Sequence, residues 1–564
     1  MYDENRKSIL STRDSTLQVQ DRRSLVLTST LVLFSSLLFS SCGGGSSTPP
    51  TYSIGGSISG LTAGGLTLAN GSDTLSITPG SGSFQFPTSV GNLTIFNVTV
   101  SAQPSGLNCL VGYGYGKVQA ADVSTVQVNC FTDWTWIGGS SAPNSIGVYG
   151  IQGTASVVNM PGSRYGSMSW VDTAGQLWLF GGVGSDGAGG YGSLNDLWRY
   201  SPLTGQWAWV SGSISASASG VYGSQGVPSA VNSPGARIGT VSWTDLGGNF
   251  WLFGGSGYDS VGNLGNLNDL WMYSTTSGQW TWVSGSNLVD SQGNYGSMGV
   301  AATTNVPPAR EEAAAWTDHA GRFWLFGGAG PAGGSYLVFL NDLWMYGPTT
   351  HQWTWISGST GPRAAGVYGT QGTASATNTP GARIGGAQWT DSSGNLWLMG
   401  GYGYDYSGVT ASWINDLWMF DTDTTQWTWV SGLDSIGGVA TVDAPGVAAT
   451  SNVPGALFQT ANWSDSSGTF WMFGGFGNFN LEDQNYENGL WEYKPSTSEW
   501  TYATAYGISA VSYGSLGVPS STNIPSARTG AATWVDANGK HWMFGGTGED
   551  SNNEPANFGD LWNF

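Results

Sequence analysis

The sequence predicts an all-β protein whose larger part is a ring of six four-stranded units, the arrangement known as a β-propeller. An aromatic strand that ends in Gly-Gly recurs six times along the 564 residues, at spacings of 71 to 74. Three further aromatic strands accompany it in each unit, and turns rich in Gly and Asp separate the strands. We therefore expect residues 132–564 to form a six-bladed propeller, preceded by a small module at residues 52–131.

Each strand of a unit has its own tryptophan position. The first strands contain Trp170, Trp243, Trp316, Trp389, Trp463 and Trp534, and the second contain Trp178, Trp251, Trp324, Trp397, Trp471 and Trp542. The third contain Trp198, Trp271, Trp344, Trp418, Trp491 and Trp562, and the fourth begin at Trp134, Trp207, Trp280, Trp353, Trp427 and Trp500. Because 29 of the 30 tryptophans recur in this way, we expect them to pack between blades.

The two ends of the repeat region predict closure of the ring. Residues 561–564 are the third strand of a unit that lacks its fourth, and residues 134–137 are a fourth strand without a unit. Together the two pieces complete one blade, so the N-terminal strand is expected to close the ring. A closed ring leaves no long sheet edge exposed.

Three of these strands carry a resemblance to a known family. The Gly-Gly strand at residues 178–182, the aromatic strand at 195–198 and the Trp-x-Trp strand at 207–209 resemble kelch repeats of the galactose-oxidase-like superfamily. The resemblance covers about 430 residues and implies a kelch-type propeller. Copper oxidases of that superfamily use His and Tyr ligands and a Tyr cross-linked to Cys. No Cys follows Cys130, and His319, His351 and His541 belong to different units, so we expect no such catalysis. A sugar-converting, mutarotase-like enzyme remains the alternative.

Residues 1–41 have the pattern of an export signal of the lipoprotein type. Arg22 and Arg23 precede an apolar run at residues 25–39 that is too short for a stable membrane span. The sequence Phe-Ser-Ser-Cys at 39–42 resembles a bacterial lipobox, which implies lipidation of Cys42 and a place at the outer membrane or cell surface. Ordinary secretion is the alternative. Residues 42–51 are expected to form a flexible tether.

The module at residues 52–131 alternates apolar and polar residues in short runs, which predicts a small β-sandwich. Cys109 and Cys130 are the only cysteines after Cys42. In an oxidising compartment they are expected to form a disulfide, with two buried free thiols as the alternative.

The charges of the chain limit its partners and its structure. A net charge of −20 argues against nucleic acid as a partner. Five units share an arginine and an aspartate, whereas unit five has Leu457 and Gly489 at these two positions. The joint loss predicts an ion pair within each of the other units, with an arginine ring that grips an anion as the alternative. The predicted pairs are Arg164 with Asp196, Arg237 with Asp269, Arg310 with Asp342, Arg383 with Asp416, and Arg528 with Asp560.

Recognition is expected on the face that carries the long loops, because the loops between second and third strands vary most. The candidate ligand-binding residues are Tyr258, Asp259, Tyr402, Tyr404, Asp405, Tyr406 and Trp413. We expect a non-catalytic protein that binds a protein or a glycan there and needs no cofactor. Acidic loop residues provide either a Ca²⁺ site or a solvated acidic rim: Glu482, Asp483, Glu487, Glu549, Asp550 and Glu554.

Overall fold

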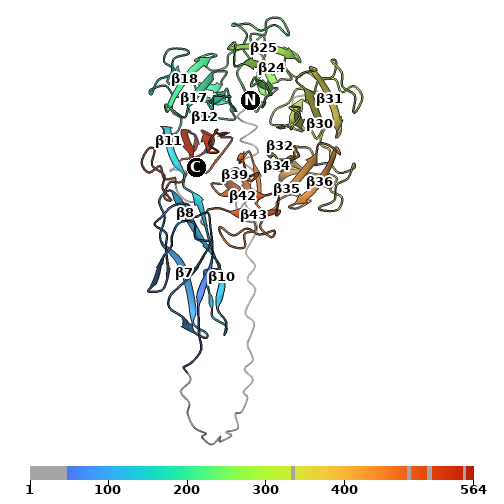
Figure 1. Cartoon of the computed structure of the whole chain (residues 1–564). Coiled ribbons are helices and arrows are strands. Elements are labelled where there is room, and N and C mark those ends of the chain that lie inside the picture. Colours follow the sequence, from blue (N-terminus) through green and yellow to red (C-terminus); the bar gives the residue numbers. More distant parts are fainter. Residues whose placement is uncertain (1–47, 332–336, 479–483, 505–510, 551–553) are drawn as a thin grey trace, which may run out of the picture. The chain divides into compact units, whose positions relative to one another are not determined.

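The computed structural model describes residues 48–331, 337–478, 484–504, 511–550 and 554–564. These residues form β-strands and no helix, so the all-β prediction is confirmed. Residues Pro50–Phe564 form one compact unit (Figure 1). The predicted signal and Cys42 lie outside the described residues. Within the described part of the chain there is no helix with the length and apolar character needed to cross a membrane.

The small module consists of two four-stranded sheets that share one apolar core. The first sheet has the order β5-β2-β10-β8, with bounds Ser83–Gln85, Ile54–Ser59, Val123–Thr132 and Leu107–Gly112. The second has the order β4-β3-β7-β9, with bounds Asp73–Ser76, Thr67–Asn70, Ile95–Ala102 and Tyr115–Lys117. A short pair, β1 (Thr51–Tyr52) and β6 (Val90–Gly91), completes the module. Alternating burial along β7 shows the period of two that the sequence predicted.

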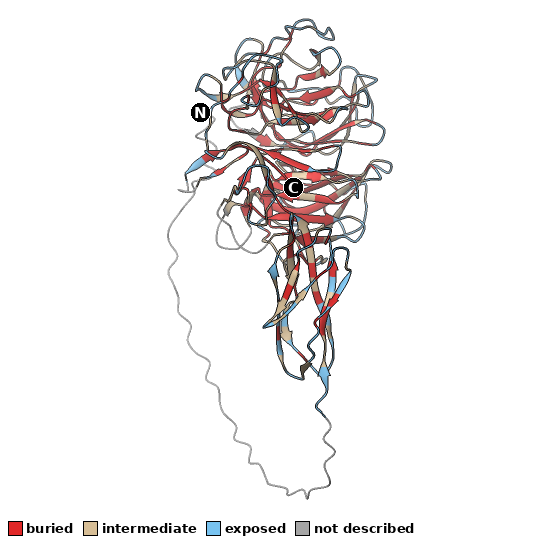
Figure 2. Ribbon diagram, turned by 60° about the vertical axis from the view of Figure 1, so that its left-hand side comes forward, coloured by how far each residue is buried: buried red, intermediate tan, exposed pale blue. Residues whose placement is uncertain are grey.

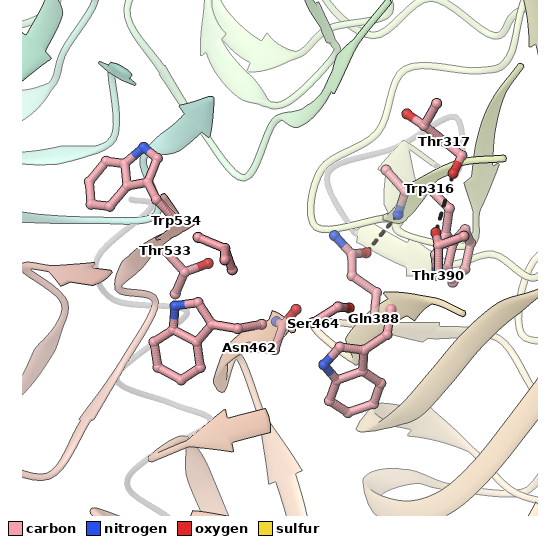
Figure 3. A pocket seen from close by; sticks show the side chains of 12 residues that line it. Trp316, Thr317, Gln388, Thr390, Asn462, Ser464, Thr533 and Trp534 are labelled. Carbon is pink, nitrogen blue, oxygen red and sulfur yellow. Dashed lines mark hydrogen bonds between the residues drawn. The ribbon is translucent and has the colours of Figure 1, made fainter. Parts of the chain in front are cut away.

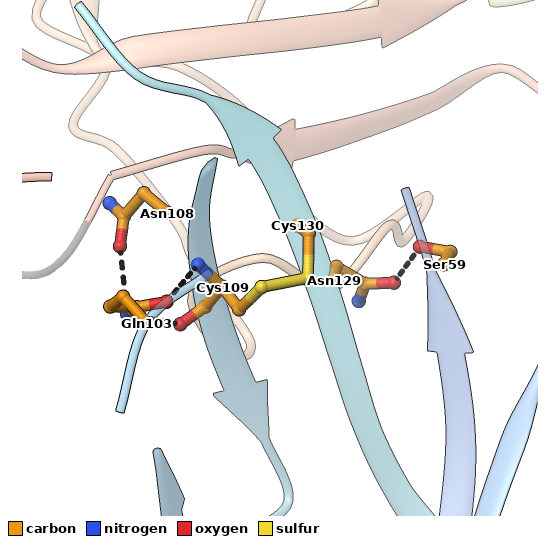
Figure 4. The surroundings of a disulfide bond; sticks show 6 residues. All are labelled: Ser59, Gln103, Asn108, Cys109, Asn129 and Cys130. Atoms are coloured by element: carbon orange, nitrogen blue, oxygen red, sulfur yellow. Dashed lines mark hydrogen bonds between the residues drawn. A yellow bond between two sulfur atoms is a disulfide. The ribbon is translucent and has the colours of Figure 1, made fainter. Parts of the chain in front are cut away.

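The predicted disulfide is confirmed. Cys109 on β8 and Cys130 on β10 are directly opposed in the antiparallel register and are bonded to each other (Figure 4). Gln103 supports the bridge, because its Oε1 accepts a hydrogen bond from the backbone N–H of Cys109 at 2.8 Å. The bond therefore joins neighbouring strands inside the core of the module.

Antiparallel sheets built on four long strands recur in the repeat region, one for each sequence unit, and in unit four the short strand β32 (Arg383–Ile384) joins the sheet as a fifth strand. Unit one has β13 (Met168–Val171), β14 (Leu177–Phe180), β17 (Leu197–Ser201) and β18 (Gln206–Ser211). Unit two has β20 (Val241–Thr244), β21 (Phe250–Phe253), β24 (Leu270–Ser274) and β25 (Gln279–Ser284). Unit three has β26 (Ala314–Thr317), β27 (Phe323–Phe326), β30 (Leu343–Gly347) and β31 (Gln352–Ser357). Unit four has β33 (Ala387–Thr390), β34 (Leu396–Tyr404), β35 (Ala411–Asp421) and β36 (Gln426–Ser431). Unit five has β38 (Ala461–Ser464), β39 (Phe470–Phe473), β42 (Leu490–Lys494) and β43 (Glu499–Tyr502). Unit six combines β45 (Ala532–Val535), β46 (His541–Phe544) and β49 (Gly559–Asn563) with β11 (Thr135–Ser140).

Short strands pair within the connecting loops. They are β12 (Arg164–Tyr165), β15 (Val183–Ser185) and β16 (Tyr191–Ser193); β19 (Arg237–Ile238), β22 (Ser256–Tyr258) and β23 (Leu264–Asn266); β28 (Ala329–Pro331) and β29 (Leu337–Phe339); β32 (Arg383–Ile384); β37 (Ala456–Phe458), β40 (Phe476–Asn478) and β41 (Gln484–Tyr486); β44 (Arg528–Thr529), β47 (Thr547–Glu549) and β48 (Pro555–Asn557). They extend the sheets into the loops and give these loops a fixed path.

The hairpins between first and second strands follow the predicted turn chemistry. In unit one the Asp172 Oδ1 accepts hydrogen bonds from the N–H groups of Ala174 and Gln176, each at 2.9 Å. Gly175 has a φ of +73°, a conformation that favours glycine. The other oxygen of Asp172 accepts the indole N–H of Trp178 at 2.8 Å, so the turn also fixes a core side chain.

Tryptophans join neighbouring units, as the sequence predicts. Each first-strand indole donates a hydrogen bond to a backbone carbonyl of the next unit: Trp170 to Trp243, Trp243 to Trp324, Trp316 to Trp397, Trp389 to Trp471, and Trp463 to Trp542. The sixth indole, of Trp534, donates to the carbonyl of Trp178 in unit one at 2.9 Å. The first strands β13 and β45 also contact each other. Aromatic cores therefore lie between the sheets, which are buried along much of their length (Figure 2).

Candidate functional site

The predicted arginine and aspartate of each pair lie together in all five units. The Arg237 Nη1 and Nη2 each lie 2.7 Å from one oxygen of Asp269, and both side chains are fully buried. The four other predicted pairs have the same bidentate geometry. Each guanidinium also donates to backbone carbonyls, as Arg237 does to Gly235 and Gly254. These arginines are therefore buried and paired inside the fold, and they do not form an arginine ring that could bind an anion.

Two further side chains complete each pair, and sequence reasoning did not assign them. The Tyr222 hydroxyl and the Trp271 indole both donate to the Oδ2 of Asp269, at 2.6 Å and 2.7 Å. Burial, followed by the nearby Asp269 carboxylate, raises the pKa of Tyr222 well above its usual value. The same tyrosine recurs as Tyr149, Tyr295, Tyr368 and Tyr513. The sequence signal for this partner is a Tyr-Gly pair that recurs in the long loops of these five units.

Unit five has lost this whole network. Val442 occupies the place of the tyrosine, next to the same loop bridge, which here joins Thr441 and Val453. A side chain at Gly489 would meet the ring of Tyr502 at 2.8 Å, so the space of the aspartate is filled by an aromatic ring. Glu487 stands where the other units have Leu, Ile or Phe, and burial raises its pKa to about 7.

The loop residues predicted to bind a ligand are mostly packed. Trp413 is only 7% exposed, and its ring lies against those of Tyr402 and Phe476, with centroids 5.1 and 5.9 Å away. Tyr402 and Tyr404 are half-buried and contact Phe339. Trp413 therefore presents no free ring to a ligand, because it packs against Tyr402 of its own unit and Phe476 of the next one.

The two predicted loop aspartates are structural as well. Asp259 is fully buried and accepts hydrogen bonds from the N–H groups of Val261, Asn263 and Val289. Asp405 likewise accepts hydrogen bonds from the N–H of Ser407 in its own loop and from that of Ile436 in the loop after β36. Burial opposes ionisation of Asp405, but these hydrogen bonds outweigh it and lower its pKa. Tyr406 is 60% exposed and Tyr258 is half-buried, so they are the candidate loop residues that keep accessible surface besides Tyr402 and Tyr404.

The acidic loop residues do not come together as a metal site in the described residues. Glu482 and Asp483 lie outside the described residues. The Asp550 carboxylate accepts a hydrogen bond from the backbone N–H of Glu554 at 3.0 Å. Within the described part of the chain, no three His, Cys, Asp or Glu side chains are placed to hold a metal ion.

A chain of backbone hydrogen bonds links the residues just before the first strands. The N–H of Gly166 donates to the carbonyl of Gly530, and the chain continues through Gln459, Gly385 and Glu312 to Gly239. These five bonds are 2.7–3.1 Å long. All six residues have positive φ, and two of them, Glu312 and Gln459, are not glycine. Their side chains are bonded to each other, Gln459 Nε2 to Glu312 Oε1 at 2.7 Å. These six residues are called the backbone ring below, although five bonds join them and no backbone hydrogen bond among the described residues links Gly239 to Gly166.

A cavity of about 430 Å³ lies further along the same first strands, on the side of their hairpin turns. It is a largely open space lined by residues from β26, β33, β38 and β45 (Figure 3). The polar lining residues are Thr317, Gln388, Thr390, Asn462, Ser464 and Thr533, and the remaining lining residues are Ala315, Trp316, Trp389, Trp463, Trp534 and Val535. We call this space the strand cavity. Sequence reasoning did not identify it, although the residue before each first-strand Trp varies between units while the Trp does not.

Two hydrogen bonds hold the walls of the strand cavity. The Gln388 Oε1 accepts the backbone N–H of Ala315 at 2.6 Å, and the Thr390 hydroxyl donates to the Thr317 carbonyl at 3.3 Å (Figure 3). Both bonds connect neighbouring units, so the cavity is bounded by side chains held at fixed positions.

Fold and site together define an all-β repeat protein with four-stranded sheets and a polar, uncharged cavity between its first strands. No protein-family model matches the chain, and no curated protein matches it with significance.

Proposed function

We propose that this protein is an exported, lipid-anchored binding protein whose six repeats form a closed kelch-type propeller. Closure is supported by the antiparallel pairing of β11 with β49 and by the indole bond from Trp534 in unit six to unit one. The backbone ring supports it too, because one of its five bonds joins Gly166 of unit one to Gly530 of unit six. The kelch assignment rests on the repeated strand sequences described above.

The proposed activity is the binding of a protein or a glycan, without catalysis. The composition of the strand cavity carries this proposal: its lining contains hydroxyl, amide and indole groups, and no carboxyl, imidazole, amine or thiol. General acid–base catalysis needs such a group close to the substrate, and a Ser or Thr hydroxyl needs one as its base before it can act as a nucleophile. Uncharged hydrogen-bonding groups around a cavity are instead suited to recognition.

The mutarotase-like alternative requires acids or arginines beside a sugar. The five repeated arginines are fully used in the ion pairs, which counts against their participation. Binding and catalysis are separated by an array of glycans and proteins followed by incubation with the sugars that bind. We expect capture of a ligand and its recovery unchanged. Conversion of a bound sugar would favour the enzyme instead.

The proposed anchor is tested by metabolic labelling with a fatty acid. We expect incorporation into the wild-type protein and none into Cys42→Ala, because Cys42 is the cysteine of the lipobox-like sequence. Fractionation of the same cells is expected to place the wild type in the outer membrane. Equal labelling of the two proteins would exclude Cys42 as the lipidation site.

A further inference from the structure

We infer that the strand cavity binds an uncharged, polyhydroxylated ligand, such as a sugar residue of a neutral glycan. This inference rests on the proposed binding function and names the site and ligand class for it. Its basis is the set of hydrogen-bonding groups that line the cavity, the absence of charged groups among them, and the size of the cavity.

Several polar groups of the lining have no partner among the described residues. They are the Gln388 Nε2, the Asn462 Oδ1, the Ser464 hydroxyl, the Thr317 hydroxyl and the Thr533 hydroxyl. They include an amide donor, an amide acceptor and three hydroxyls that both donate and accept. A ligand that satisfies this set must itself carry adjacent donors and acceptors, which is the property of a polyol.

The charge of the lining selects against ions. None of the twelve lining residues is ionisable at neutral pH. A bound anion would find no cation in the lining and would face a chain with a net charge of −20. A bound cation would find no carboxylate among the lining residues, and burying an unpaired charge is costly. A neutral ligand avoids both costs.

The size of the cavity fits part of a glycan. A volume of about 430 Å³ lies within the usual range of small-ligand pockets. The backbone ring and the Glu312–Gln459 hydrogen bond lie before the first strands, whereas the cavity is lined by residues of the first strands themselves. A glycan would therefore enter from the side of the hairpin turns, opposite to the long loops.

The variation between units also favours recognition. The residue before the first-strand Trp is Ser169, Ser242, Ala315, Gln388, Asn462 or Thr533. The four that line the cavity include both amides, which lie in adjacent units. The Gln388 side chain also bonds the neighbouring unit, but those of Asn462 and Thr533 have no such bond among the described residues, so contact between units does not account for their polar groups.

The experiment uses the purified chain from residue 43 onwards and an array of neutral and acidic glycans. The tightest neutral glycan is then titrated calorimetrically into the wild type, Gln388→Met and Thr533→Val. Both changes keep side-chain size and remove hydrogen-bonding groups. Ser242→Ala is the matched control, because this residue has the same strand position but does not line the cavity. Thermal melting of every variant reports folding independently, and Thr533→Val removes a hydroxyl that has no partner among the described residues.

We expect each cavity variant to bind about tenfold more weakly, the loss of about one hydrogen bond, and the control to bind like the wild type. Neutral-glycan binding that is unchanged in both cavity variants would overturn the cavity as the site and leave the proposed binding function standing. Selective binding of acidic glycans would overturn the ligand class. Binding of neither a glycan nor a protein on the arrays would overturn the proposed function itself.

Discussion

At the scale of single residues, the fold depends on charges that are buried and fully paired. Burial alone would lower the pKa of Arg237, but Asp269 more than compensates and the pKa is raised. Such a pair is costly to break, because removal of one partner leaves the other charge buried. Unit five shows the other stable solution, in which Leu457 and Gly489 remove both charges together.

A double-mutant cycle on Arg237 and Asp269 tests this dependence. Arg237→Ala and Asp269→Ala are each expected to lower the free energy of unfolding by about 3–5 kcal/mol. The double variant is expected to lose less than the sum of the two, with a coupling of at least about 1 kcal/mol. Urea unfolding followed by tryptophan fluorescence measures all three. Strictly additive losses would show that the pair is not coupled.

His541 predicts a specific dependence of stability on pH. It occupies the position of Phe250, Phe323 and Phe470, and its Nε2 is buried without a partner among the described residues. Burial lowers its pKa to about 4 from 6.5. The unfolded chain therefore binds the proton first as pH falls, and stability is lost between about pH 6.5 and 4.

His541→Phe removes this titrating group. Between pH 7 and pH 4, the variant is therefore expected to lose about 3 kcal/mol less free energy of unfolding than the wild type. Stability curves of the two proteins across this range provide the measurement. An identical loss of stability in wild type and variant would place the acid sensitivity elsewhere.

At the scale of strands and turns, those features could be predicted from the sequence that depend on interactions between residues close together in the chain. The Asp172–Gly175 turn and the tryptophan strands were predictable, because a hydrogen-bonding Asp, a Gly at positive φ and alternating burial act within a few residues. The packing of Trp413 was not predictable, since it depends on Phe476 from the next unit. The strand cavity was missed because it is formed by strands that lie far apart in the sequence.

The disulfide of the module predicts a local effect. The double change Cys109→Ser and Cys130→Ser opens a loop of sequence separation 21 and is expected to destabilise the module by about 3 kcal/mol. The module has its own apolar core, separate from those of the repeat sheets. Hydrogen exchange should therefore accelerate in β8 and β10 while the repeat strands stay protected. Equal acceleration in the repeats would show that the two cores are not independent.

At the scale of the whole molecule, the β11–β49 pairing joins the start of the repeat region to its end. Without β11, the strand β49 would keep only β46 as a partner and expose an edge. Removal of Trp134 as well would eliminate its ring contacts with Phe473 and Phe564.

Deletion of residues 134–138 is therefore expected to lower the melting temperature by at least several degrees and to cause self-association through the free edge. Differential scanning calorimetry and light scattering measure the two effects. A monomeric deletion variant that melts with the parent would contradict the proposed closure.

The central claim is that a neutral glycan occupies the strand cavity. It is tested most directly by a crystal structure of the chain from residue 43 onwards in complex with its tightest neutral glycan. The account predicts a sugar residue between Gln388, Asn462 and Thr533, with hydrogen bonds to their free polar groups. A sugar seated instead on the long loops around Tyr406, with the strand cavity free of it, would contradict the account.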